Sequence, residues 1–372
     1  MYKEIIRPIV FALSKDPEIA HHALLSTLEQ VQRSKFALGA LERMTSVQDS
    51  ALAQEFFGLP FPVPVGLAAG FDKNGKAPLV WPALGFGFAE LGTVTKHKQE
   101  GNPRPRIFRL TKDGALINRM GFNNQGVDAM VDQLFRFNRK RKMTLFGSVG
   151  KSKITPLDQA VQDYCYSVTQ LYPYVDVTVT NVSSPNTEGL RKLQGKEELD
   201  MLLGALKGTT ASIAEKWREK RKPLLVKIAP DLSWEAIDDV LQVCSDKGVD
   251  GLIAVNTTLS RQGLKTVTNE NGGLSGKPLA KRAREIVRYI RQRMGKDFFL
   301  IGVGGISSPE DAYAMLCSGA NLIQLYTGLI YEGPLLPARI NKGLLELMER
   351  DGIKHISELR HFWSNTNRQL SA

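Results

Sequence analysis

The feature that most constrains the fold of this chain is a repeated alternation of short apolar runs with longer helical patterns, beginning near residue 60. Eight of the runs have the length and β-branched character of buried strands. Alternation of this kind predicts an α/β protein, specifically a (β/α)8 TIM barrel. The predicted strands are 62–67, 89–95, 143–149, 175–181, 224–228, 251–256, 298–303 and 322–326.

Helical patterns fall between the predicted strands, over 156–171, 198–219, 233–247, 277–294 and 309–318. The last begins with Ser308 as a cap and Pro309 just inside, an ordinary helix start. A doubly wound open sheet is the alternative, but its GxGxxG fingerprint is missing after the first strand. Residues 96–142 are too long for a simple connection, so we expect them to form a lid or a subsite.

The sequence predicts a small helical extension over residues 1–45 and a barrel domain over residues 46–372. Apolar residues recur there at helical spacing, and Asp16 followed by Pro17 predicts a helix start. Two interpretations stay open for these helices. They could form a cap packed wholly on the barrel, or an interfacial hairpin lying in a membrane surface, since apolar stripes flanked by Lys and Arg behave that way.

The formal charge of +11 and the isoelectric point near 9.5 predict attraction to an anionic partner: nucleic acid, a lipid surface or a phosphorylated small molecule. Charge alone does not choose among these. The three cysteines and five histidines lack the spacing of a disulfide frame or a metal site, so we expect no metal and a reducing compartment. No run of about 18 apolar residues occurs, which predicts no membrane-spanning helix.

Polar groups collect where the predicted strands end. The stretch 181–187 places two amides and two hydroxyls around Pro185, which suits a flat polar heterocycle, although the same residues are common turn formers. Lys73 follows the first strand, and Lys227 lies inside the apolar fifth strand, where burial without a partner is costly. Glycine-rich turns at 302–306 and 326–328 predict a phosphate cradle after strands seven and eight.

Residues 118–124 form a dense cluster of amides beside Arg119. Amides and a cation together suit a ring that carries a carboxylate. The alternative is a polar loop whose Asn and Gly only make turns.

Taken together and in this order, these motifs resemble the dihydroorotate dehydrogenases, and specifically class 2, the membrane-associated and quinone-dependent branch. The most specific matches are 69–73, 118–122, 181–187, 272–276 and the final pair of glycine turns. The resemblance implies that the barrel binds FMN and oxidises (S)-dihydroorotate to orotate in pyrimidine biosynthesis. It also implies that Ser184 is the catalytic base, where class 1 has a cysteine.

By the same resemblance, one set of residues would bind substrate and a second set would bind FMN. Two departures concern the second set: Ser148 stands where the family usually has an asparagine, and Val255 where a threonine is frequent. The implied substrate residues are Lys73, Asn118, Arg119, Met120, Gly121, Phe122, Asn181, Asn186, Asn256 and Thr257. The implied FMN residues are Ala69, Gly70, Phe71, Asp72, Lys73, Thr93, Ser148, Asn181, Lys227, Val255, Gly276, Gly305, Tyr326 and Thr327.

The resemblance further implies a membrane quinone as electron acceptor and an anionic membrane surface as partner. We expect a monomer that is peripheral on the cytoplasmic face of a bacterial inner membrane. A rival is an FMN barrel acting on tRNA, but aromatic residues interleaved with basic ones are not evident, so no nucleic acid is expected. A barrel that only binds a flavin is a second rival, which Ser184, Lys73 and Lys227 argue against.

Overall fold

A closed ring of eight parallel strands forms the centre of the computed structural model, which describes residues 2–14, 16–137 and 141–361. The ring order is β3, β4, β7, β8, β9, β10, β12 and β13, and β13 pairs with β3 to close it. The predicted TIM barrel is therefore confirmed. The strands are β3 (Val65–Leu67), β4 (Phe88–Val94), β7 (Thr144–Val149), β8 (Val177–Asn181), β9 (Leu224–Ile228), β10 (Gly251–Ala254), β12 (Phe299–Val303) and β13 (Leu322–Leu325).

Each predicted strand exists, but six are shorter than predicted: β3 by three residues, β8 and β10 by two, and β7, β12 and β13 by one. Pro62 and Pro64 have no N–H to donate to a ladder, so β3 begins only at Val65. Strand β10 ends at Ala254, where the chain turns toward the strand-end loops.

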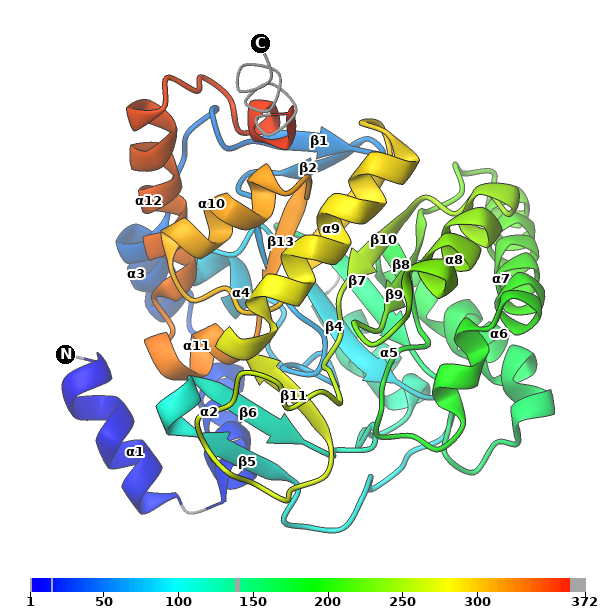
Figure 1. Cartoon of the computed structure of the whole chain (residues 1–372), viewed down its shortest axis with the longest axis horizontal. Helices are drawn as coiled ribbons and strands as arrows, with labels where there is room; N and C mark the ends of the chain where they lie inside the picture. Colours follow the sequence, from blue (N-terminus) through cyan, green and yellow to red (C-terminus); the bar gives the residue numbers. More distant parts are fainter. Residues whose placement is uncertain (1, 15, 138–140, 362–372) are drawn as a thin grey trace.

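Helices surround the ring, with α6, α7 and α8 grouped on one side and α9 and α10 crossing in front in Figure 1. The five helices predicted for the barrel are present within a few residues of their expected ends. Described helices are α4 (Val80–Ala83), α5 (Val127–Phe135), α6 (Ala160–Leu171), α7 (Lys196–Trp217), α8 (Trp234–Asp246), α9 (Ala280–Met294), α10 (Pro309–Cys317), α11 (Thr327–Glu332) and α12 (Leu336–Arg350). Short 3-10 turns lie at Thr111–Asp113, Leu157–Gln159, Tyr172–Tyr174, Leu190–Gln194, Lys277–Leu279 and Ile356–His361.

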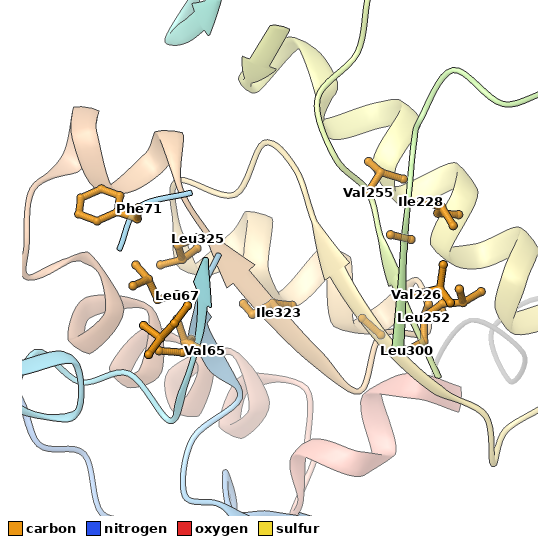
Figure 2. Close-up of a cluster of buried hydrophobic side chains, with 14 of the residues drawn as sticks. Val65, Leu67, Phe71, Val226, Ile228, Leu252, Val255, Leu300, Ile323 and Leu325 are labelled. Carbon is orange, nitrogen blue, oxygen red and sulfur yellow. The ribbon is translucent and has the colours of Figure 1, made fainter. Parts of the chain in front are cut away.

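Alternation along the strands decides which side chains enter the barrel. Figure 2 shows Val226 and Ile228 of β9, which belong to the same apolar cluster as Leu252 of β10. This cluster lies between the strands and the helices. Because successive side chains of a strand point to opposite faces, Lys227 between them points into the barrel interior.

Aromatic rings fill the amino end of the barrel. The hairpin of β1 (Gln54–Phe56) and β2 (Leu59–Phe61) lies there, and it was not predicted from the sequence. Its Phe61 makes ring contacts with Phe88, Phe146 and Phe299 at centroid distances of 5.7, 6.2 and 6.4 Å. Since this end is filled by apolar side chains, an open cavity has room only at the opposite, carboxyl end of the strands.

A three-stranded antiparallel sheet lies away from that hairpin, at the bottom of Figure 1. Two of its strands come from the long insertion after β4, as expected for a lid with its own structure. The third comes from the connection between β10 and α9, a partnership that the sequence did not reveal. The strands are β5 (Ile107–Leu110), β6 (Ala115–Asn118) and β11 (Gly273–Gly276), in the order β11, β6, β5.

The N-terminal extension is helical, as predicted. The Oδ1 of Asp16 accepts a hydrogen bond from the backbone N–H of Glu18 at 2.8 Å, which confirms the predicted cap. None of the described helices is both long and apolar enough to cross a bilayer. The last part of the predicted barrel domain, 362–372, lies outside the described residues. The helices are η1 (Tyr2–Ile6), α1 (Arg7–Leu13), α2 (Pro17–Val31) and α3 (Lys35–Thr45).

A buried ion pair ties α2 to the insertion. The carboxylate of Glu18 accepts hydrogen bonds from Nε and Nη2 of Arg106 at 2.8 and 2.6 Å, and the two side chains are only 1% and 5% exposed. Arg104 adds a second cation at 3.2 Å. Burial by itself would raise the pKa of Glu18, but the hydrogen bonds and charge of Arg106, followed by Arg104, lower the pKa to about 2.

This ion pair predicts a pH-dependent stability. The pKa of Glu18 is about 2 when folded against an ordinary 4.5, so its contribution is complete above about pH 4.5 and is lost as pH falls toward 2. Glu18→Gln leaves Arg106 buried without a carboxylate, which should lower the free energy of unfolding by about 3 kcal/mol at neutral pH. Urea unfolding across this pH range should show the difference shrinking in acid.

The matched control is Glu100→Gln, which removes an exposed carboxylate from the same segment and should leave stability unchanged. A destabilisation by Glu18→Gln that stays constant from neutral to acidic pH would contradict the assignment.

Candidate functional site

A cavity opens at the carboxyl ends of the barrel strands, with about 980 Å³ of empty space including its open mouth. The cavity lies at the end of the barrel opposite the aromatic rings that fill the amino end. Most of the residues predicted from the sequence line it. These are Ala69, Gly70, Lys73, Thr93, Asn118, Met120, Gly121, Phe122, Asn181, Ser184, Asn186, Lys227, Val255, Asn256, Thr257, Gly276, Gly305, Tyr326 and Thr327.

Two predicted residues, Phe71 and Asp72, lie behind the cavity wall. Asp72 is fully buried and accepts hydrogen bonds from the backbone N–H groups of Lys76 and Ala77 at 2.8 and 2.9 Å. Phe71 packs edge-on against Trp81 at 5.7 Å. Both therefore shape the loop that carries Lys73 rather than line the cavity.

The structure also places Ser148 and Arg119 outside the cavity lining. Ser148 is buried and shares a hydrogen bond of 3.0 Å with Thr93, which does line the cavity. Ser148 therefore contacts the site only indirectly, by its hydrogen bond to Thr93. The guanidinium of Arg119 turns to the outer side of the lid, where it pairs with Glu270 at 2.6 Å.

A network of amides holds the loop that carries Ser184, whose side chain is buried. The backbone N–H of Asn186 donates to Ser184 Oγ at 3.3 Å, and its Nδ2 donates to Asn118 Oδ1 at 3.2 Å. Asn181 Nδ2 donates to Thr93 Oγ1 at 2.7 Å. These bonds connect the loop to β4 and to the lid, and the loop places Ser184 in the cavity lining.

Lys227 is buried in the barrel interior with a partner that the sequence reading missed. Its Nζ lies 2.8 Å from Oε2 of Glu90, and the side chains are 5% and 0% exposed. The same oxygen accepts the backbone N–H of Ala69 at 3.3 Å, while Oε1 has no hydrogen-bond partner among the described residues. Glu90 interrupts an apolar strand just as Lys227 does, so the same reasoning could have found it.

Gln324 is a second missed residue, and its environment indicates a ligand. It lines the cavity and is 1% exposed, yet neither Nε2 nor Oε1 has a hydrogen-bond partner in the described part of the chain. A buried amide without partners is costly, because its lost hydrogen bonds to water are not replaced. A polar heterocycle in the cavity would supply both a donor and an acceptor.

Two glycines in the cavity lining stand where the fold has no room for a side chain. A Cβ on Gly305 would lie 2.4 Å from the Cβ of Ala280, and one on Gly276 would lie 2.4 Å from the carbonyl oxygen of Gly114. Both positions also have positive φ, +74° and +99°, which side chains rarely adopt. The unpartnered amide of Gln324 fits the polar edge of the FMN ring, and the glycine-containing lining at Gly276, Gly305 and Thr327 offers backbone N–H groups that fit its phosphate.

The charge of Lys73 is sensitive to pH. Burial is the main cause that lowers its pKa, to about 8, with Glu18 opposing and Arg106 reinforcing the shift. Lys73 is therefore mostly protonated at neutral pH but loses its charge soon above it. On α2, burial first and the charge of Lys73 second lower the pKa of His21 to about 3, so His21 is neutral.

Aromatic rings connect the N-terminal extension to the cavity wall. His21 of α2 contacts Phe71 edge-on at 5.0 Å, and Phe71 contacts Tyr326 at 5.6 Å. Tyr326 itself lines the cavity. The extension thus lies directly against the wall of the site.

Comparison with known proteins agrees with this geometry. A family model described as dihydroorotate dehydrogenase matches residues 51–348. The chain is 52% identical over 349 residues to "Dihydroorotate dehydrogenase (quinone)" of Chloroflexus aurantiacus, covering 92% of this chain and 96% of that protein. It is 47% identical over 347 residues to the protein of the same name from Christiangramia forsetii, covering 93% and 99%.

Among solved structures, the chain is similar to the crystal structure of DHODH from Eimeria tenella in complex with ferulenol. The TM-score is 0.85 at 36% sequence identity, covering 94% of this chain and 97% of that one. Fold and family match define the class: the protein is an oxidoreductase of the (β/α)8-barrel type. It belongs to the dihydroorotate dehydrogenase family.

The Glu90–Lys227 pair predicts a strong non-additive effect on stability. Glu90→Gln and Lys227→Met each leave one charge buried without its partner, so each should lower the free energy of unfolding by about 3 kcal/mol. The double variant should cost much less than the sum, because no buried charge remains. Chemical unfolding of the four proteins measures this coupling.

The matched control is the exposed pair Lys196–Asp239, whose atoms lie 3.4 Å apart. Lys196→Gln with Asp239→Asn should change stability by less than about 1 kcal/mol. Strict additivity of the Glu90 and Lys227 variants would mean that the two charges do not compensate each other.

Proposed function

We propose that the protein oxidises (S)-dihydroorotate to orotate with FMN as hydride acceptor and a membrane quinone as final electron acceptor, in pyrimidine biosynthesis. The observation that carries the proposal is the convergence of Ser184, Lys73, Asn118 and Lys227 on one cavity. Those residues come from distant parts of the chain, and only barrel closure brings them together. Membership of the dihydroorotate dehydrogenase family supports the same reaction.

The residues that would hold FMN follow from the cavity lining. Gly276, Gly305 and Thr327 form the cradle for its phosphate, where backbone can approach closely. The free amide of Gln324 and the ammonium of Lys227 would face the polar edge of the ring. When bound, FMN supplies the group that accepts the hydride.

Substrate would lie between the amides and the base. Asn118, Asn186 and Asn256 present neutral donors and acceptors for the edges of the ring, and Lys73 presents a cation for its carboxylate. Ser184 Oγ would take the proton from C5. Since a hydroxyl is a poor base in water, its site must exclude water, and the N–H of Asn186 at 3.3 Å would stabilise negative charge on the oxygen.

Ser184→Ala tests the role of the base. We expect the variant to bind FMN and orotate as the original protein does, because the amide network that holds the loop uses other side chains as well. Dihydroorotate should reduce the flavin about a hundredfold more slowly, or slower still. The measurement is the anaerobic loss of the yellow colour of the flavin.

Thr169→Ala serves as the control, because it removes an exposed hydroxyl on α6 far from the cavity lining. A nearly unchanged rate of flavin reduction in Ser184→Ala would reject Ser184 as the base.

The N-terminal extension supports quinone as the acceptor. On its side toward the barrel, His21 contacts Phe71, which in turn contacts Tyr326 of the cavity lining. The extension also carries Leu13 and Phe36, which are 83% and 86% exposed. Exposed apolar side chains on a segment that packs beside the cavity lining are what an acceptor dissolved in lipid would require.

The exposed apolar side chains of the extension support attachment to a membrane surface. Further apolar side chains of the extension are exposed, including Ile9 at 52%, Ile19 at 58% and Met44 at 65%. Apolar side chains beside basic ones insert into the headgroup region and favour anionic lipid. We place the protein as a peripheral monomer on the cytoplasmic face of a bacterial inner membrane.

The double variant Leu13→Asp with Phe36→Asp tests this attachment and leaves the buried Glu18–Arg106 pair intact. Deleting residues 1–45 would remove Glu18 and so break that pair. Two exposed apolar side chains become charged, so affinity for anionic vesicles should fall by about tenfold or more. Reduction of a quinone dissolved in the vesicles should fall with it, whereas reduction of a water-soluble dye should not.

The control is Phe135→Asp with Met201→Asp, which charges two side chains of similar exposure, 70% and 63%, on barrel helices. If both double variants lose vesicle binding equally, or neither does, the extension is not the membrane-binding surface.

A further inference from the structure

A second hollow, the outer basin, lies on the outer side of the loops that cover the cavity. It contains about 1340 Å³ of empty space including its open mouth, and its lining includes Arg119, Lys153, Asn186, Arg261 and Glu270. Asn186 lines the cavity as well. The loop that carries Ser184 therefore forms part of the partition between the outer basin and the site of reaction.

The outer basin is lined by three cations, two of which form no ion pair with a carboxylate among the described residues. Lys153 Nζ contacts only the amide Oδ1 of Asn102, at 3.5 Å, and Arg261 donates to backbone carbonyls such as that of Gly272 at 2.7 Å. Across the described residues, no carboxylate lies within ion-pair distance of either. Cations in a cleft whose charge is not balanced by an ion pair attract small anions.

The third cation, Arg119, forms a contact across the mouth. Its Nη1 lies 2.6 Å from Oε2 of Glu270, which joins the insertion after β4 to the connection after β10. The side chains are 28% and 39% exposed, so the ion pair is accessible to water. Such a pair contributes little stability and exchanges partners easily.

The guanidinium is held in place while its carboxylate partner is free to change. Arg119 lies over the ring of Phe108 at 4.5 Å and also donates to the backbone carbonyl of Asn271 at 3.2 Å. An arginine fixed in this way presents its donor fork to any carboxylate that arrives. Glu270 is thus a competitor that a carboxylate-bearing ligand can displace.

We propose that the outer basin is an access site for the carboxylate-bearing substrate. There the carboxylate of the substrate replaces Glu270 on Arg119, before the loop around Asn186 lets the molecule pass into the cavity. Arg119 then binds the substrate as it enters and leaves the protein, and does not contact the substrate during the reaction. This inference rests on the proposed function, because it takes the substrate to be a small ring carboxylate.

The test follows the binding of orotate to the full-length, FMN-loaded protein by rapid mixing, with the flavin absorbance as signal. Arg119→Gln should lower the association rate constant about tenfold and weaken its dependence on salt. The dissociation rate constant should fall by a similar factor, so the equilibrium dissociation constant changes little. Flavin reduction at saturating dihydroorotate should keep its rate.

Glu270→Gln is the second variant, and its expected effect has the opposite sign. Removing the competitor leaves Arg119 open, so association should become faster, by about threefold. A folding defect cannot imitate this result, since it would slow binding. Lys98→Gln is the matched control: it removes one exposed positive charge from the same insertion outside the lining of the basin, and should change nothing.

Two outcomes would overturn the inference. An unchanged association rate in Arg119→Gln would show that the outer basin is not on the path. Weaker equilibrium binding of orotate with unchanged association would instead place Arg119 on the bound substrate. Failure of the original protein to bind orotate, or to lose its flavin colour with dihydroorotate, would reject the proposed function and not this inference alone.

Discussion

Closure of the strands into a ring is the constraint on which the rest of this structure depends. Because β13 pairs with β3, every strand turns one face to the helices and the other into a single interior. Aromatic rings fill the amino end, so polar interior side chains gather at the carboxyl end. Lys227 and Glu90 lie on strands that are far apart in sequence, and closure brings their charges to 2.8 Å. Neither could be buried without the other.

In the N-terminal extension, polar contacts hold the helices on the barrel, so some apolar side chains of these helices are left exposed. Glu18 pairs with Arg106, and Thr45 Oγ1 donates to the carbonyl of Ala83 at 2.7 Å, so directional bonds hold the helices on the barrel. Leu28 packs into the core, whereas Phe36 stays 86% exposed. The extension therefore packs on the barrel, as one of the two interpretations expected, and it keeps several apolar side chains exposed; the membrane interpretation stays a proposal.

Most of the cavity could be predicted because strand-end residues in a barrel share one rim. Arg119 shows the limit of that reasoning. It follows Asn118 directly, yet Asn118 lines the cavity while Arg119 points to the outer basin. Adjacent residues at a strand end face opposite sides, and only the pairing of β6 with β11 decides which side is which. Glu90 and Gln324 were missed although each interrupts an apolar strand, the signal that singled out Lys227.

The sequence by itself determined the number and order of the barrel strands, the helices between them, the capped start of α2 and the loops that meet at the rim. These follow from periodicity, capping and turn residues, which act over a few neighbours in the chain. Only the tertiary structure decided which charges are compensated, how β11 completes the lid and which side chains face inward. Those outcomes depend on contacts between residues far apart in the chain, and a local pattern carries no information about distant partners.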